Sequence, residues 1–271
     1  MTPPRVLVIA GSDSGGGAGI QADIKAITML GGHAMTAVTA VTAQNSLGVT
    51  AVHAIPPALV AAQIDAVASD LGLDAVKIGM LGGAAIVAAV ADRLAALPPV
   101  PVVFDPVMIA TSGAVLADAA TVAAFARLMA RAALVTPNLP ELAALTGMGV
   151  AGETAVEAAA ATLARLHGVA VLAKGGHGEG PVLTDRLFDA AGAEVARWHS
   201  DRIDTRHTHG TGCTLASGIA VGLATGLGLA DAIGRARAYV RAAILAAPGY
   251  GAGAGPMGHA LGRDPFAVLA A

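Results

Sequence analysis

Short runs of branched apolar residues alternate along this chain with longer alanine-rich segments of helical periodicity. Glycine, proline or charged residues bound the short runs, which is typical of β-strands. We predict strands at Arg5–Ala10, Thr36–Thr42, Ala75–Gly79, Val102–Asp105, Leu134–Thr136 and Val169–Lys174. We predict helices near Ile20–Leu30, Pro57–Leu71, Ala84–Leu97, Ala117–Ala130 and Thr154–His167. This alternation favours an α/β fold, with a mostly parallel central sheet and helices on both faces.

The pattern changes in the last third of the chain. Val182–Phe188 and Glu194–His199 are strand-like and flank Ala191-Gly192, so they predict an antiparallel hairpin at one edge of the sheet. Two helices and a loop are expected after the hairpin, at about Thr211–Thr225, Ala230–Ala246 and Gly249–Gly258. We find no linker and no internal repeat, so residues 1–271 are expected to form a single domain.

The composition narrows the classes of partner. Only 13% of the 271 residues are charged and 55% are hydrophobic, which excludes a disordered chain. The 16 basic and 19 acidic residues give a net charge of −3, so we expect neither nucleic acid nor a membrane surface as a partner. A single cysteine excludes an internal disulfide framework and fits the reducing cytoplasm. The N-terminus shows no signal-peptide pattern.

One uncharged segment, Cys213–Ala230, is as long as a short membrane span. Its hydrophobicity is low for such a span, because four glycines interrupt it: Gly218, Gly222, Gly226 and Gly228. We interpret the segment as a buried helix that packs closely through its glycines.

Polar and glycine-rich segments follow the predicted strands. They are Gly11–Gly19, Gln44-Asn45, Gly79-Met80, Asp105–Met108, Pro137–Glu141 and Lys174–His177. The carboxyl ends of parallel strands meet at one edge of a sheet, where α/β proteins bind their ligands. We therefore expect these segments to surround one site.

The most informative motif is His209-Gly210-Thr211-Gly212-Cys213-Thr214, which leads directly into a predicted helix. Its two glycines leave backbone N–H groups exposed at the positive end of that helix, where a phosphate can bind. Cys213 lies in the first helical turn, where the helix end is expected to lower the pKa of the thiol and allow it to act as a base. A phosphate site beside a proton acceptor suggests phosphoryl transfer to a hydroxyl group, although such turns also occur for packing alone.

Other residues at this edge could attend a nucleotide and a metal. Asn138 and Glu141 are three residues apart, so they could hold Mg²⁺ directly or through water, or simply form a capping box. Lys174 could place its ammonium group on a phosphate, or lie at the surface. Asp105 could hold a metal-bound water, or cap a turn.

The acceptor would occupy the other half of the site. Gln44 offers a paired donor and acceptor that suit a heteroaromatic ring edge. Met80, Val107 and Met108 could pack against a flat ring, although core packing would also explain them. Asp23 could bond a ligand or face solvent.

His207 and His209 lack the partners of a zinc site. We interpret the polar segment Asp204–Thr208 as a mobile flap over the nucleotide.

Taken together, the motifs resemble the hydroxymethylpyrimidine/phosphomethylpyrimidine kinases of thiamine biosynthesis, in the ribokinase-like superfamily. The resemblance spans nearly the whole chain. Its motifs are Gly11–Asp23, Thr42–Asn45, Lys77–Leu81, Asp105–Met108, Thr136–Asn138, Lys174–His177 and His207–Thr214.

The resemblance implies ATP-dependent phosphorylation of 4-amino-5-hydroxymethyl-2-methylpyrimidine and then of its monophosphate. It implies that Gln44 bonds the pyrimidine, with Gly11, Asp23, Met80 and Val107 as further substrate-binding candidates. It also implies that Cys213 is the base and that the Gly210–Cys213 backbone stabilises the phosphoryl group. Asn138, Lys174, Thr211 and Gly212 are the implied nucleotide-binding residues, and Glu141 and Asp105 the candidates for Mg²⁺.

The resemblance also suggests a homodimer. Two positions depart from the family pattern. The superfamily more often has aspartate where this chain has Cys213, which is consistent with slow turnover, because a thiol ionises less readily. Ser46 stands where the family often has threonine.

Three alternatives remain at this stage. A pyridoxal or pyridoxine kinase would act on a similar flat ring that bears a hydroxymethyl group. A nicotinamide-dependent oxidoreductase would need an acidic residue where the sequence has Thr42–Asn45. A non-catalytic pyrimidine sensor would bind the same ring without releasing ADP.

Overall fold

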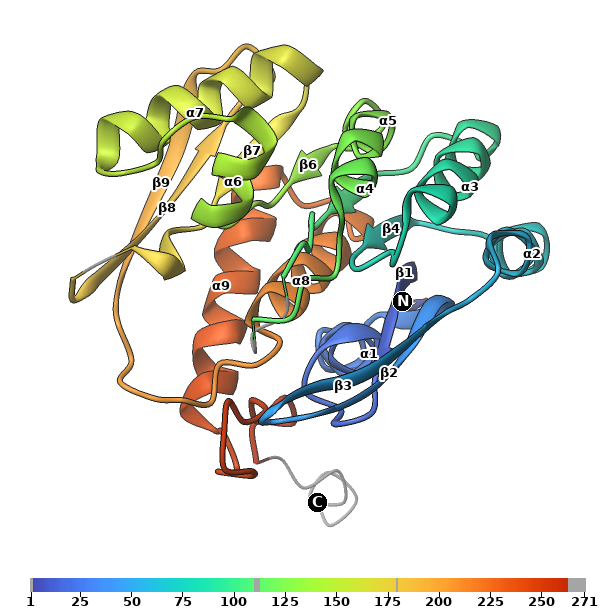
Figure 1. Cartoon of the computed structure of the whole chain (residues 1–271), viewed down its shortest axis with the longest axis horizontal. Helices are drawn as coiled ribbons and strands as arrows, with labels where there is room; N and C mark the ends of the chain where they lie inside the picture. Colours follow the sequence, from blue (N-terminus) through green and yellow to red (C-terminus); the bar gives the residue numbers. More distant parts are fainter. Residues whose placement is uncertain (1, 110–112, 179, 263–271) are drawn as a thin grey trace.

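A single nine-stranded sheet organises the computed structural model, which describes residues 2–109, 113–178 and 180–262 (Figure 1). The strand order is β3-β2-β1-β4-β5-β6-β7-β8-β9. The strands are β1 (Arg5–Asp13), β2 (His33–Asn45), β3 (Gly48–Ala54), β4 (Ala75–Ile78), β5 (Val102–Phe104), β6 (Leu134–Val135), β7 (Ala170–Ala173), β8 (Val182–Phe188) and β9 (Glu194–Asp201). The six strands from β2 to β7 in this order run parallel, whereas β3, β8 and β9 are antiparallel to their neighbours.

Helices cover both faces of the sheet. They are α1 (Gly19–Met29), α2 (Pro57–Asp70), α3 (Ala84–Ala96), α4 (Ala119–Ala124), α5 (Ala126–Met129), α6 (Leu139–Thr146), α7 (Glu153–His167), α8 (Thr211–Ala224) and α9 (Leu229–Leu245), with a short 3₁₀ turn η1 (Gly175–His177). Helices α1, α8 and α9 contribute to the core on one face, and α2 to α7 contribute to the core on the other (Figure 1).

Strand β1 shows why the sheet needs a layer of helices on each side. Leu7 and Ile9 belong to one core, while Val6 and Val8 belong to the other. All four side chains are fully buried. Burying one such side chain contributes roughly 1.5–3 kcal/mol, so leaving either face uncovered would be costly.

These observations confirm the predicted fold class, its strand–helix alternation and the antiparallel hairpin. Strand β3, which makes the other edge of the sheet antiparallel as well, was not predicted. Of α6, only the start at the Asn138 capping box was predicted, and the helix continues to Thr146. The predicted helix at Ala117–Ala130 is interrupted at Phe125, whose ring packs edge-on against Phe104 with centroids 5.1 Å apart.

The close packing predicted for this uncharged segment is confirmed for Gly218 and Gly222. A Cβ atom on Gly218 would lie 2.9 Å from the Cβ of Ala236, and one on Gly222 would lie 2.7 Å from the Cβ of Ala232. Both alanines belong to α9, so any larger residue at either glycine would push the two helices apart. Gly226 and Gly228 lie beyond the end of α8 instead. Within the described ranges, no helix is long and apolar enough to cross a bilayer.

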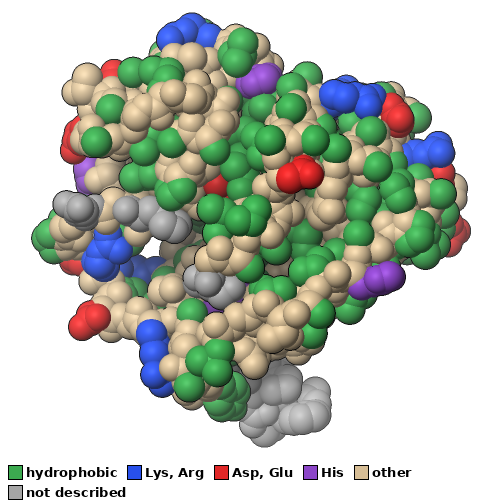
Figure 2. Space-filling view, in the orientation of Figure 1, with side chains coloured by type: hydrophobic (Ala, Val, Ile, Leu, Met, Phe, Trp, Pro, Cys, Tyr) green, Lys and Arg blue, Asp and Glu red, His purple; other side chains and the backbone are tan. Residues whose placement is uncertain are grey.

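Charged side chains are scattered over the face of the molecule drawn in Figure 2. Basic and acidic groups alternate there in small clusters, and no continuous basic surface appears on this face. That distribution agrees with the nearly balanced charge of the chain.

Candidate active site

A cavity of about 1230 Å³ lies at the carboxyl ends of the parallel strands. Its lining includes residues from the ends of β1 and β2, the segments after β4 and β5, and the start of α8. The edge of the sheet therefore gathers most of the predicted site residues. The cavity wall includes Gly11, Gln44, Met80, Asp105, Val107, Asn138, Glu141, Lys174, Gly210, Thr211, Gly212 and Cys213.

The predicted phosphate turn begins α8. Gly210 is the N-cap residue, with φ of 87°, and a Cβ at this position would overlap the carbonyl oxygen of Gly17. A Cβ on Gly212 would lie 3.3 Å from Asp105 Oδ2 and 3.4 Å from Lys174 Nζ. Glycine at position 210 lets the turn pack against the Gly17 backbone, and glycine at position 212 lets it approach the Asp105 carboxylate and the Lys174 ammonium group closely. Residues 210–213, at the start of α8, line the cavity, so the positive end of the helix faces it.

Asp105 and Lys174 form an ion pair beside this turn. Lys174 Nζ lies 2.7 Å from Asp105 Oδ1, which also accepts a hydrogen bond from Thr136 Oγ1 at 3.0 Å. Burial would lower the pKa of Lys174, but Asp105 and Glu141 raise it above its ordinary value. Lys174 is therefore charged at neutral pH and suited to a phosphate. Because Asp105 bonds a hydroxyl and an ammonium group, it does more than cap a turn.

Asn138 and Glu141 form the capping box of α6. The Asn138 side chain accepts from the Glu141 backbone N–H at 2.9 Å, and Glu141 Oε2 accepts from the Asn138 backbone N–H at 2.8 Å. Burial raises the pKa of Glu141 to about 7, although Lys174 opposes the shift. The capping interpretation is confirmed, while the role of this carboxylate toward a metal stays a prediction.

Cys213 lies in the cavity wall, but its ionisation differs from the expectation. Burial raises the pKa of the thiol to about 11, and the positive charge of Lys77 only partly offsets that effect. The prediction of a lowered pKa was wrong, because loss of solvation outweighs the influence of the helix end. At neutral pH the resting group is a thiol.

Asp23 is absent from the cavity wall. The expectation that it binds substrate or faces solvent was therefore wrong. Its carboxylate is fully buried and pairs with Lys77 Nζ at 2.8 and 2.9 Å. Ser217 Oγ donates to the same carboxylate at 2.7 Å. The pair connects α1, β4 and α8 beneath the site. Sequence reasoning missed Lys77 and Ser217 because neither lies at the end of a strand.

The acceptor side contains Gln44, Met80 and Val107 as predicted. Gly11 leaves room for the Met80 side chain, because a Cβ at position 11 would lie only 2.5 Å from Met80 Cε. Thr39 Oγ1 donates to the Met80 carbonyl at 2.7 Å and fixes the backbone from which this methionine projects.

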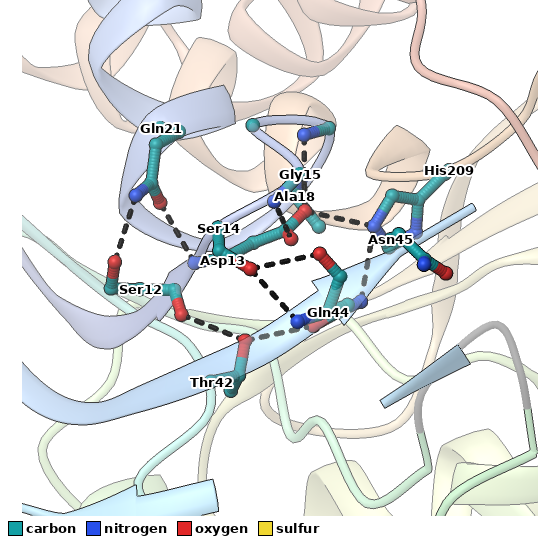
Figure 3. Close-up of polar contacts among 12 residues, drawn as sticks. Ser12, Asp13, Ser14, Gly15, Ala18, Gln21, Thr42, Gln44, Asn45 and His209 are labelled. Carbon is teal, nitrogen blue, oxygen red and sulfur yellow. Dashed lines mark hydrogen bonds and ion pairs between the residues drawn. The ribbon is translucent and has the colours of Figure 1, made fainter. Parts of the chain in front are cut away.

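Asp13 and His209 are site residues whose role the sequence did not reveal. Figure 3 shows the Asp13 carboxylate between the glycine-rich loop and the His209 ring, whose Nε2 lies 2.9 Å away. The motifs contain both residues, but only the fold brings positions 196 residues apart together. Among the described residues, no cluster of His, Cys, Asp and Glu could hold a metal by itself.

The segment Asp204–Thr208 borders the same cavity through Asp204, Thr205 and Thr208. Arg206 donates to the carbonyl oxygens of Ala252 and Gly251 at 3.2 and 3.3 Å. This position agrees with a flap over the nucleotide, and its motion stays a prediction.

Comparison with known proteins gives a consistent result. The sequence model of the phosphomethylpyrimidine kinase family matches residues 13–258. A hydroxymethylpyrimidine/phosphomethylpyrimidine kinase of Rhizobium meliloti is 49% identical over 93% of this chain and 96% of its own length. A thiamine biosynthesis bifunctional protein of Geobacter sulfurreducens is 49% identical over 96% of this chain, which spans about half (53%) of that relative.

A solved structure of Bacillus subtilis pyridoxal kinase in complex with ADP is also similar. It is 31% identical, with a TM-score of 0.85 over 96% of this chain and 98% of that one. The similarity confirms the ribokinase-like architecture. The family match, the identity to full-length relatives and the geometry of the cavity agree that this chain is a kinase and belongs to the phosphomethylpyrimidine kinase family.

Proposed function

We propose that this kinase transfers the γ-phosphoryl group of ATP to 4-amino-5-hydroxymethyl-2-methylpyrimidine and then to the resulting monophosphate. One observation carries the proposal. A single cavity contains an amide side chain suited to a ring edge, Gln44, and a glycine turn suited to a phosphate, Gly210–Gly212. The same cavity wall contains a potential proton acceptor, Cys213, directly after the glycine turn. The acceptor and the donor of the phosphoryl group would therefore meet beside this residue.

The first transfer needs a proton acceptor. The hydroxyl oxygen forms a bond to the γ-phosphorus, the bond between that phosphorus and the departing ADP oxygen breaks, and the hydroxyl proton passes to the Cys213 thiolate. Backbone N–H groups of Gly210–Cys213 and the ammonium group of Lys174 stabilise the charge on the moving group. Since the resting thiol has a pKa of about 11, only a small fraction of the enzyme holds the thiolate at neutral pH, so we expect slow turnover.

The residues present also fit Mg²⁺. Asp105 and Glu141 place two carboxylates in the cavity wall, and Mg²⁺ prefers oxygen ligands, waters and substrate phosphates. Bound there, the ion would neutralise phosphate charge. Because both carboxylates already accept hydrogen bonds from the protein, we propose that they hold the ion partly through water. Asn138, Lys174, Thr211 and Gly212 would contact the nucleotide phosphates.

A pyridoxal kinase is the second candidate, because the solved structure of such an enzyme has the same architecture. A coupled ADP-release assay with MgATP separates the two when it is run in parallel on hydroxymethylpyrimidine, its monophosphate and pyridoxine. We expect turnover of both pyrimidines to exceed that of pyridoxine. Preference for pyridoxine would overturn the proposed acceptor, and absence of ADP release with any ring would leave only a binding protein.

We further propose that the chain works as a single catalytic domain in the cytoplasm and forms a homodimer. Its partners are then ATP and a small pyrimidine, and it has no role on nucleic acid or membranes. The single nine-stranded sheet and the scattered surface charge support this proposal. Exposed apolar side chains on β2 and β3 support the dimer.

A further inference from the structure

A chain of polar side chains connects the acceptor side of the cavity to the phosphate turn (Figure 3). His209 Nε2 lies 2.9 Å from Asp13 Oδ2 and 3.2 Å from the amide nitrogen of Gln44. The amide oxygen of Gln44 lies 3.2 Å from Thr42 Oγ1, which lies 3.0 Å from the Ser12 carbonyl oxygen. His209, Asp13 and Thr42 are all buried. The positions of the protons in this hydrogen-bonded network therefore decide which amide atoms of Gln44 are left to bind a ligand.

The first proton is fixed by Asp13. Its Oδ2 accepts hydrogen bonds from the backbone N–H groups of Gly17 at 3.0 Å and Ala18 at 2.8 Å, and Oδ1 accepts one from Gly15 at 2.8 Å. Burial alone would raise the pKa of Asp13, but His209 and these N–H groups hold it below its ordinary value. Asp13 is thus an ionised acceptor, and His209 Nε2 must carry the proton that lies between them.

Gln44 must then meet His209 with an acceptor. An amide nitrogen facing Nε2–H would place two donors 3.2 Å apart. Thr42 is compatible with this orientation. Its single hydroxyl proton can be donated to the Ser12 carbonyl at 3.0 Å instead of to Gln44 at 3.2 Å, and its oxygen can then accept from the Gln44 amide nitrogen. A 180° rotation of the amide about Cγ–Cδ keeps its shape. The amide oxygen then shares the Nε2 proton with Asp13 in a three-centre hydrogen bond, and the amide nitrogen donates to Thr42. The oxygen of Gln44 then faces His209 and its nitrogen faces Thr42.

We propose that His209, held by Asp13, is a specificity-determining positioning residue that fixes the orientation of the Gln44 amide. This inference rests on the proposed function. In the fixed orientation Gln44 has one N–H and one oxygen lone pair left for a ligand. An aminopyrimidine edge, with a ring nitrogen beside an amino group, offers the complementary acceptor and donor. The reversed amide would exchange the positions of this free N–H and this free lone pair, so it would no longer match the aminopyrimidine edge. Pyridoxine has no ring amino group, so its binding should not depend on the orientation of the amide.

The test compares three variants on the full-length enzyme. His209→Leu removes the donor at similar volume, and His209→Gln keeps an N–H donor on a side chain of similar reach. His33→Leu is the control for a histidine-to-leucine change, because His33 is exposed at the start of β2 and lies outside the cavity lining. We expect His209→Leu to raise KM for hydroxymethylpyrimidine roughly tenfold or more, the usual effect of leaving a buried polar group unpaired. We expect kcat, KM for ATP and kcat/KM for pyridoxine to change less than about threefold, and both His209→Gln and His33→Leu to resemble the wild type.

A second measurement isolates the amide. Equilibrium binding without ATP is compared for hydroxymethylpyrimidine and an analogue that lacks the ring amino group. We expect the amino group to strengthen binding to the wild type and to lose most of that effect in His209→Leu. An equal effect in both proteins would overturn the inference, as would a fall in kcat with KM unchanged, or equal losses in His209→Gln and His209→Leu. If the wild type fails to phosphorylate the pyrimidine at all, the proposed function fails instead.

Discussion

Two opposing influences act on the thiol of Cys213. Its place in the first turn of α8 favours the thiolate, and so does the charge of Lys77, but burial favours the neutral form and wins. The sequence showed the helix end and could not show the burial, which depends on every element that surrounds the cavity. If Cys213 is the base, as we propose, the fold sets the fraction of thiolate through this burial.

We predict that kcat for the first phosphorylation rises with pH between about 7 and 10. A raised pKa means that the neutral thiol persists to high pH, and the thiolate fraction grows about tenfold per pH unit below the pKa of about 11. The measurement is kcat at saturating hydroxymethylpyrimidine and MgATP across this range. A flat profile for the wild type would contradict Cys213 as the base.

We also predict that Cys213→Ala affects the two phosphorylations unequally. The first acceptor is a hydroxyl that must lose a proton, and general-base catalysis contributes about 10²–10⁴-fold. The second acceptor is a phosphate oxygen with a pKa near ~6, already ionised at neutral pH. Turnover of hydroxymethylpyrimidine should fall at least about a hundredfold, and that of its monophosphate much less. The measurement is the rate of ADP release with each acceptor. Equal losses with both acceptors would show that Cys213 contributes through packing and not as a base.

At the level of elements, α1, β4 and α8 are joined beneath the cavity by Asp23, Lys77 and Ser217. Both charged side chains have no exposed surface. Removing one partner of such a pair leaves a buried charge, which typically costs about 3–5 kcal/mol. We predict that Lys77→Met lowers the free energy of unfolding by about this amount, measured by denaturant titration.

The matched control is the exposed ion pair of Arg127 and Asp92, whose side chains are 52% and 67% exposed. Asp92→Asn should change the free energy of unfolding by less than about 1 kcal/mol, because solvent screens surface pairs. A Lys77→Met protein as stable as this control would show that neighbouring groups neutralise Asp23 at little cost.

Elements differ in how well the sequence predicted them. The parallel strands were found because both their faces are buried, so they consist of continuous apolar runs such as Val6–Ile9. Strand β3 was missed because it is an edge strand whose side chains are mostly exposed, and its sequence carries no such run. The residues at the strand ends were predicted because parallel strands must end together. The contacts of His209 and Lys77 were not, since they depend on how α8 and its preceding loop dock on β1 and β4.

At the level of the whole molecule, the two helix layers close both faces of the central strands, yet one part of the sheet stays open. Val41 pairs with His53 and Ala43 with Ala51 in the β2–β3 ladder, so these four side chains share a face. All four are exposed, Val41 by 48%. The face lies directly before Gln44 on β2, and Gln44 lines the cavity.

We predict that a second copy of the chain covers this face, and that light scattering gives a mass near twice 26.3 kDa. Ala51→Arg places a charge in the centre of the face and should yield monomers, since an unpaired charge is costly in an apolar interface. Leu166→Arg, at an exposed position on α7, is the control and should stay dimeric. Because β2 carries Gln44, the monomer should also show a raised KM for the pyrimidine while KM for ATP stays the same. A wild type that is monomeric at micromolar concentrations, or an Ala51→Arg variant that still dimerises, would contradict this assembly.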